Sequence, residues 1–173
     1  MDLDFRLATT WISGNKGYKA LKLSTRIRYG TRALVDIARF GGDGPVSLRD
    51  IARRQDVSQP YLEQLILLLK AAGLVRSIRG ARGGFLLAKN ASEVTAAEIV
   101  TVLGGNITIV DCVGDPDVCS RAEDCVLRDL WADVSYAIND VLGSTTLASL
   151  VEKELDKESG REPGKESVRS LRG

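Results

Sequence analysis

The chain has 173 residues, of which 44% are hydrophobic, and its formal net charge is +1. This length and composition suit one compact domain, or one domain with an appended element, around an apolar core. No apolar run of about 18 residues occurs, which argues against a membrane span, and the first residues lack the continuous apolar core of a signal peptide.

The small net charge hides an uneven distribution. Residues 22–90 hold 13 Lys and Arg against 5 Asp and Glu, a balance of +8, whereas residues 91–159 hold 4 against 14, a balance of −10. A basic front half suits a polyanion, and the acidic back half predicts a different role. Histidine is absent, and no phosphate-binding glycine loop or nucleophile–base pair can be placed. The sequence therefore argues against an enzyme with a small-molecule substrate.

The first predicted element is a helix that Ser24 opens and that runs to about Phe40. The preceding residues 1–20 show no clean period and are interpreted as an extension that need not be native. The buried side of the helix is expected to hold Ile27, Ala33, Leu34, Ile37, Ala38 and Phe40. The remaining positions are rich in arginine, which predicts either a solvated face or contacts to phosphates: Arg26, Arg28, Arg32 and Arg39.

After a GGDGP loop, residues 46–73 have the pattern of two helices joined by a tight turn. Ser47 is an N-cap candidate for a short helix over residues 48–55. Ser58 is expected to cap the second helix, with Pro60 in its first turn, where a missing N–H costs nothing. The apolar residues of the second helix recur at helical spacing: Tyr61, Leu62, Leu65, Leu68 and Leu69.

Gly73 is predicted to end the second helix, and two short strands are expected to follow, over residues 74–78 and 85–88. Between them, RGARGG forms a glycine-rich tip that carries Arg79 and Arg82. Two helices and a basic hairpin are the pattern of a winged helix-turn-helix (HTH) that binds double-stranded DNA. Any small α+β domain can contain these elements, but the arginine tip and the local charge favour DNA binding.

The back half is predicted to contain three further helices and an irregular segment. Thr95 is expected to cap a helix over AAEIVTVLGG, and residues 105–125 are expected to be irregular. A long helix should run from about Asp124 to Leu142 and end at Gly143, and a last short helix should begin at Thr145 or Thr146. The long helix carries an apolar stripe formed by Val126, Leu127, Leu130, Trp131, Val134, Ile138, Val141 and Leu142.

This stripe either packs on its own domain or forms a symmetric dimer. We prefer the dimer, because it would place two helix-turn-helix units one turn of DNA apart. The overall prediction is a mostly α fold with a small β-wing and a long dimerisation helix. It has four parts: an extension (1–20), a winged helix-turn-helix domain (21–90), a cysteine loop with dimerisation helices (91–155), and a disordered tail (156–173).

Three cysteines lie within 14 residues: six residues separate Cys112 from Cys119, and five separate Cys119 from Cys125. An odd number so close together is a poor disulfide framework and favours a metal or redox site in a reducing compartment, so we expect a cytoplasmic protein. The spacing lacks the paired cysteines of a zinc ribbon. Three thiolates before a helix can hold an iron–sulfur cluster if a fourth ligand arrives from elsewhere. Zinc and a thiol switch remain alternatives.

The chain resembles the Rrf2 family of bacterial winged-helix regulators, which includes IscR, NsrR, RirA and CymR. The resemblance rests on LSTRIRYGTRALVDIA, DIARRQDVSQPYLEQLILLLKAAGLV and SIRGARGGFLL, and on three cysteines followed by LWADV. It covers about Leu21 to Leu155 and is nearest in pattern to IscR, the iron–sulfur cluster regulator. It implies a homodimeric transcription factor whose second HTH helix enters the major groove, whose wing arginine enters the minor groove and whose long helix crosses its partner's.

Matched to the family motifs, the resemblance assigns DNA binding to Ser58, Gln59, Pro60, Tyr61, Glu63, Gln64, Arg79, Gly80, Arg82, Gly83 and Gly84. It also implies that Cys112, Cys119 and Cys125 hold a 2Fe–2S or 4Fe–4S cluster, whose state alters which promoters are bound.

Two departures from the family pattern concern this cluster. The first cysteine gap is one residue longer than in IscR, and Arg128 stands where IscR has a histidine ligand. NsrR-like members use an acidic residue of the other subunit, and Arg28 stands at that position. The remaining candidates for a fourth ligand are Glu123, Asp124, Asp129 and a loop aspartate. The departures favour a sensor of redox state, nitric oxide or iron. The alternative is a family member without a cluster, controlled by cysteine oxidation or a partner protein.

Overall fold

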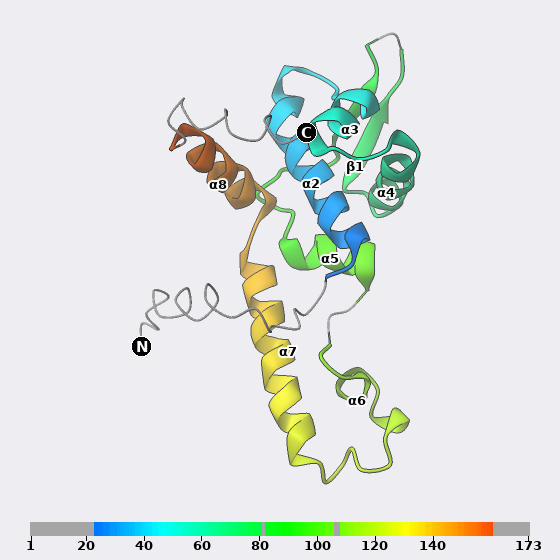
Figure 1. The fold of residues 1–173 in the computed structure, drawn as a ribbon, viewed down its shortest axis with the longest axis vertical. Helices are drawn as coiled ribbons and strands as arrows, with labels where there is room; N and C mark the ends of the chain where they lie inside the picture. The colour runs from blue at the N-terminus through cyan, green and yellow to red at the C-terminus, as the bar shows by residue number, and fades with distance from the viewer. Residues whose placement is uncertain (1–22, 81, 106–107, 161–173) are drawn as a thin grey trace, which may run out of the picture.

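The computed structural model describes residues 23–80, 82–105 and 108–160, so the predicted extension at 1–20 and the tail beyond residue 160 lie outside the described residues. The described part is mostly helical, with one antiparallel pair of strands, which confirms the predicted fold class (Figure 1). Its helices are α2 (Thr25–Phe40), α3 (Leu48–Gln55), α4 (Gln59–Ala71), α5 (Ala96–Gly104), α6 (Asp111–Gly114), α7 (Val126–Ser144) and α8 (Leu147–Ser159). The strands are β1 (Val75–Ile78) and β2 (Gly84–Leu87), and short 3-10 helices are η1 (Gly41–Asp43) and η2 (Pro116–Val118).

Helix α2 is the central element, and α3, α4, α5 and α8 all pack against it. Ser24 precedes its first turn as predicted, and it caps the helix, because its hydroxyl accepts a hydrogen bond from the backbone N–H of Ile27 at 3.2 Å. Leu34 and Ile37 are fully buried on its inner face. Phe40 was predicted to be buried with them, but it is 38% exposed, since its ring lies beneath two guanidinium groups at the end of the helix rather than in the core.

The two predicted HTH helices are α3 and α4. Ser47 accepts a hydrogen bond from the N–H of Asp50 at 3.1 Å, and Asp56, in the left-handed region at φ 50°, makes the tight turn between the helices. Ser58 occupies the N-cap position of α4 as predicted, but its side chain makes no capping hydrogen bond. The predicted apolar face of α4 also needs one correction: Leu68 is exposed, and Ile66 takes its place in the core.

The hairpin is anchored to the start of the HTH. Val75 lies opposite Leu87 in its register. Val46, just before α3, forms an isolated antiparallel bridge with Phe85 through two backbone hydrogen bonds of 2.9 Å. A Cβ atom at Gly84 would lie 2.4 Å from the carbonyl oxygen of Val46, so only glycine allows this close approach.

One core joins the front and back halves of the chain. Leu103 of α5 and Leu147 of α8 are fully buried in the same cluster as Leu34. Thr95 caps α5 as predicted, by accepting from the N–H of Glu98 at 3.2 Å. The hydrophobic core therefore continues past residue 90 into α5 and the beginning of α8.

Helix α7 extends away from this core, and α6 lies beside its far end (Figure 1). The predicted end at Gly143 is wrong: α7 continues to Ser144, where the hydroxyls of Ser144 and Thr145 donate to the carbonyl oxygen of Val141. The segment 105–125 is less irregular than predicted, because it contains α6 and η2.

Helix α8 also extends further than the sequence predicted. Residues 156–159, assigned to the disordered tail, form its last turn, where Glu158 pairs with Arg39 of α2.

Among the described helices, none combines the length and the apolar character needed to cross a membrane.

Candidate DNA-binding surface and cysteine loop

Helix α4 presents an open face beside a buried one. Leu62, Leu65 and Leu69 fix it on the core. Because residues one or two positions away point elsewhere on a helix, the polar residues between these leucines face outward. Five of the six α4 positions proposed for DNA recognition are exposed: Ser58, Gln59, Pro60, Glu63 and Gln64. The structure therefore brings most of the predicted recognition residues onto one surface.

Tyr61, the sixth position, is placed differently. Its ring is half-buried and packs edge-on against Tyr29 of α2, with 6.1 Å between the ring centroids. Its hydroxyl donates to Oγ1 of Thr25 at 3.4 Å. Tyr61 thus joins α4 to the start of α2, and a direct contact to DNA remains a prediction for this residue.

Basic residues lie on α2 and α3, the two helices of the front half that pack against α4. The guanidinium groups of Arg28 and Arg32 lie over the ring of Tyr29, at 5.8 and 5.5 Å from its centroid. Arg49 and Arg53 of α3 are exposed beside a shallow pocket of about 600 Å³, which Ser58 and Gln59 also line. Sequence reasoning did not select these two α3 arginines. Their four-residue spacing on a short amphipathic helix was the available signal.

The wing carries its two arginines at an exposed tip. Arg79 follows β1 directly, and Arg82 lies before β2. Gly80 has φ +120°, which L residues rarely adopt, and its carbonyl accepts from the N–H of Gly83 at 2.9 Å. Gly80, Gly83 and Gly84 are therefore needed for the geometry of the wing itself, and close approach of their backbone to a duplex remains a prediction.

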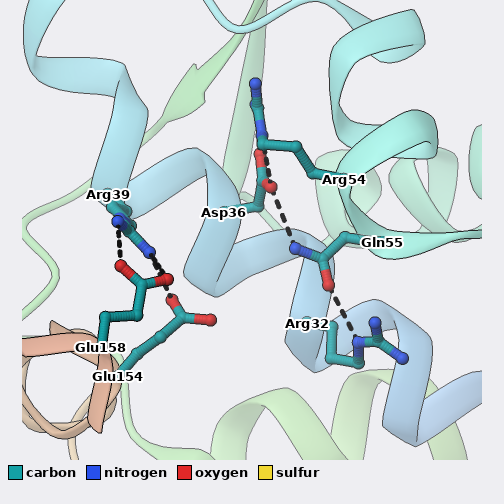
Figure 2. A network of polar contacts seen from close by, with 7 residues as sticks. All are labelled: Arg32, Asp36, Arg39, Arg54, Gln55, Glu154 and Glu158. Atoms are coloured by element: carbon teal, nitrogen blue, oxygen red, sulfur yellow. Dashed lines mark hydrogen bonds and ion pairs between the residues drawn. The ribbon is translucent and has the colours of Figure 1, made fainter. Parts of the chain in front are cut away.

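A buried carboxylate holds α3 against α2. Asp36 is 1% exposed and accepts from Nε and Nη2 of Arg54 at 2.8 and 2.6 Å, and from Nε2 of Gln55 at 3.0 Å. Oε1 of Gln55 in turn accepts from Nε of Arg32 at 2.8 Å (Figure 2). The hydrogen bond to Asp36 raises the pKa of Arg54. Sequence reasoning missed Asp36, although a carboxylate on the apolar side of α2 was a visible signal.

The three cysteines lie along the segment that runs from α6 to the start of α7, the cysteine loop. Cys112 is in α6, Cys119 follows η2, and Cys125 is the N-cap residue of α7. Each is half-buried and carries a free thiol. Nε of Arg128 donates to the carbonyl oxygen of Cys112 at 2.8 Å. The backbone N–H of Ile109 donates to Oγ of Ser135 at 3.3 Å and fixes the entry of the loop to α7.

The donor atoms suit an iron–sulfur cluster in kind, but they are not arranged as a ligand set. Three cysteine sulfurs on one loop are the ligands that such clusters use. Within the described residues, however, no three Cys, Asp or Glu side chains form a group that could hold a metal ion. The proposed fourth ligands Glu123, Asp124 and Asp129 are all exposed. The loop would have to rearrange to surround a cluster.

Comparison with known proteins gives consistent matches over most of the chain. The family model Rrf2, described as an iron-dependent transcriptional regulator, matches residues 23–153. Protein rrf2 of Nitratidesulfovibrio vulgaris is 41% identical over 131 residues, covering 76% of this chain and 87% of the relative. The HTH-type transcriptional regulator CymR of Bacillus subtilis is 42% identical over 130 residues, covering 75% and 89%. The HTH-type transcriptional regulator IscR of Serratia proteamaculans is 38% identical over 134 residues, covering 78% and 81%.

Solved structures match in the same way. The structure of CymR, the global cysteine regulator of B. subtilis, has a TM-score of 0.66 at 41% identity and covers 78% of this chain and 98% of that chain. The structure of T. potens IscR has a TM-score of 0.67 at 38% identity and covers 86% and 97%.

Proposed function

The chain belongs to the Rrf2 family of transcriptional regulators, which are not enzymes, and we propose that it binds operator DNA as a homodimer. We further propose that its cysteine loop senses redox state, nitric oxide or iron–sulfur status. The observation that carries DNA binding is the open polar face of α4 beside an arginine-tipped wing. We place the protein in the bacterial cytoplasm, where thiols stay reduced.

On DNA, the exposed face of α4 would enter the major groove, which is wide enough for a helix and presents a distinct pattern of donors and acceptors at each base pair. Gln59, Glu63 and Gln64 would contact base edges, and Arg79 would enter the neighbouring minor groove. Arg49 and Arg53 flank the start of α4 and would contact phosphates, which position a protein without reading sequence.

Salt dependence tests this arrangement. Each neutralised phosphate releases counterions, so log affinity should fall linearly with log salt concentration. The Arg49→Gln/Arg53→Gln variant should reduce the steepness by about one unit for each arginine that contacts a phosphate. Lys153→Gln, at an exposed position of α8, is the control and should keep the wild-type slope. Operator affinity that does not respond to salt would contradict the proposed interface.

Dimerisation is proposed from the stripe on α7. Val126, Leu130 and Val141 are 78%, 49% and 63% exposed, so a long apolar face of this chain remains open to solvent. A second copy would cover it by pairing α7 with α7, and the two HTH units would then address two half-sites. Sedimentation of wild type and Leu130→Asp tests this proposal. We expect a dimer that the substitution dissociates, and a wild-type monomer at micromolar concentration would overturn it.

For sensing, we propose an iron–sulfur cluster on Cys112, Cys119 and Cys125. Such a cluster would supply a centre that gains or loses an electron and reacts with small oxidants. The supporting observation is three thiols on one loop, which continues directly into α7. Anaerobic reconstitution with iron and sulfide should produce visible absorbance in wild type, and replacing any of the three cysteines with Ser should remove it.

A second candidate is control by thiol oxidation without a cluster. It is favoured by the absence, within the described residues, of a three-ligand group that could hold a metal. A solved relative, Staphylococcus aureus CymR, has been determined in an oxidized form. If the reconstituted protein stays colourless, the cluster proposal fails. Operator binding before and after mild oxidation then decides whether the thiols act directly.

A further inference from the structure

We propose that α8 holds the HTH in its DNA-reading position through a polar bridge that crosses α2. The bridge consists of Glu154, Glu158, Arg39, Phe40, Arg54 and Asp36. The part of this inference that concerns DNA rests on the proposed function, whereas the mechanical link between α8 and α3 does not.

The HTH end of the bridge is a buried, fully paired carboxylate. The side chain of Asp36 has no exposed surface, and Arg54 donates to both of its oxygens. Removing one partner of such a pair leaves an uncompensated charge in the interior, which is costly. The position of α3 is therefore tied to the position of Asp36 in α2, and Gln55 adds a third hydrogen bond from the same end of α3.

The other end joins α2 to α8, far along the sequence. Nη1 and Nη2 of Arg39 donate to the two carboxylate oxygens of Glu158 at 2.7 and 2.6 Å, and Glu154 lies 3.7 Å from the same guanidinium (Figure 2). These contacts raise the pKa of Arg39, with the Glu158 hydrogen bond as the largest cause. Bidentate pairing fixes direction as well as distance, so α8 is held in one orientation on α2.

Phe40 connects the two ends. The guanidinium carbon of Arg54 lies 4.2 Å from the centroid of its ring, and that of Arg39 lies 4.9 Å from it. An aromatic ring attracts cations placed over it, so one ring brings together two arginines that would otherwise repel each other. This role also explains why a large apolar side chain is left partly exposed at the end of α2.

Through the bridge, a displacement of α7 and α8 can be transmitted to the DNA-binding helices. Two residues separate the end of α7 from the beginning of α8, and α7 begins immediately after Cys125. A displacement of α7 would therefore reach α8 and, through Arg39, the position of α3. Coupling of this kind requires contiguous packed or hydrogen-bonded contacts, and the bridge supplies them between α8 and α3.

The test alters α8 and measures α3. In the Glu154→Gln/Glu158→Gln variant, hydrogen exchange of the α3 amides should be at least about 2-fold faster than in wild type, and operator affinity should be at least about 2-fold weaker. The matched control is Glu152→Gln/Asp156→Asn, which removes two charges from exposed positions of the same helix. Faster exchange confined to α8, with α3 unchanged from the control, would overturn the proposal.

A mutant cycle separates the bridge from a general weakening of the protein. Arg39→Gln should reproduce the effect on α3, and combining it with the α8 pair should add little, since both changes remove the same contact. Fully additive effects would contradict a shared bridge. If wild type binds no operator, the proposed function fails, and the exchange measurement still decides whether α8 positions α3.

Discussion

The guanidinium of Arg128 donates through Nε to the carbonyl oxygen of Cys112 at 2.8 Å. The backbone N–H of the same residue donates to the carbonyl oxygen of Cys125 at 2.9 Å. Arg128 therefore joins the first and last cysteines of the loop, which lie at its two ends. A guanidinium stays protonated and has no lone pair to offer a metal, so its role here is to hold the loop together.

We predict that Arg128→Ala releases the Cys112 end of the loop. The thiol of Cys112 should react faster with an alkylating reagent than in wild type, because one anchoring hydrogen bond, worth about 1 kcal/mol, is lost. Alkylation rates followed by mass spectrometry would measure this. Arg121→Ala, an exposed position in the same loop, is the control. Equal rates at Cys112 in wild type and Arg128→Ala would show that this contact does not restrain the loop.

A second prediction concerns the wing. Arg79→Ala should weaken operator binding by about 1 kcal/mol or more, because a guanidinium at the wing tip suits the negative potential of a narrow minor groove. Arg79 is exposed, so the melting temperature and the oligomeric state should stay at their wild-type values. Fluorescence anisotropy with labelled operator gives the affinity. If wild type and variant bind equally well, the wing arginine does not contact DNA.

Glu63 is expected to determine preference more than strength. Its carboxylate lies on the exposed face of α4, where it can accept from a cytosine amino group but repels phosphates. Glu63→Ala should therefore reduce discrimination between operator variants by about 1–3 kcal/mol while changing the affinity for the preferred operator less. Binding to a panel of single-base variants measures both quantities, with Glu93→Ala as an exposed acidic control. If the operator variants keep the same order of affinities and the same differences between them in Glu63→Ala, Glu63 does not contact a base.

Features that depend on neighbouring residues were predictable from the sequence, whereas features that depend on residues far apart in the chain were not. Ser47 and Thr95 were predicted as N-caps and Ser24 as the start of a helix. The structure confirms all three, because a helix start depends on neighbours a few residues away. The bridge was not predictable in this way. Its partners are distant in sequence. Helical periodicity places Asp36 on the apolar side of α2, but it does not reveal that Arg54 is its partner.

The cysteine loop shows the same limit. The spacing of Cys112, Cys119 and Cys125 indicated a common chemistry, but the directions in which three side chains point from a loop depend on contacts such as Arg128 to Cys112. Tyr61 shows a similar limit. Its place in the recognition motif predicted a DNA contact, which stays a prediction, and the motif did not reveal that its ring packs against Tyr29.

The last prediction concerns the first turn of α3, where Ser47 caps the helix and hydrogen-bonds to the side chain of Asp50. The Ser47 hydroxyl donates to Oδ2 of Asp50 at 2.7 Å, and the Asp50 N–H donates to Oγ of Ser47 at 3.1 Å. The hydrogen bond from the Ser47 hydroxyl is the largest cause that lowers the pKa of Asp50 below its ordinary value of 3.8. Burial opposes it as the next largest cause, and the charges of Arg53, Arg54 and Arg49 lower the pKa further. A carboxyl whose pKa is lower in the folded state stabilises the fold above its unfolded pKa and loses that contribution as the pH falls through the folded value.

Asp50→Asn should therefore lower the free energy of unfolding near neutral pH, and its difference from wild type should shrink between about pH 5 and pH 2. Urea unfolding across this range measures the difference, and in a Ser47→Ala background most of its pH dependence should disappear. A difference between wild type and Asp50→Asn that stays constant down to the acid end would show that the charge of Asp50 does not stabilise this turn.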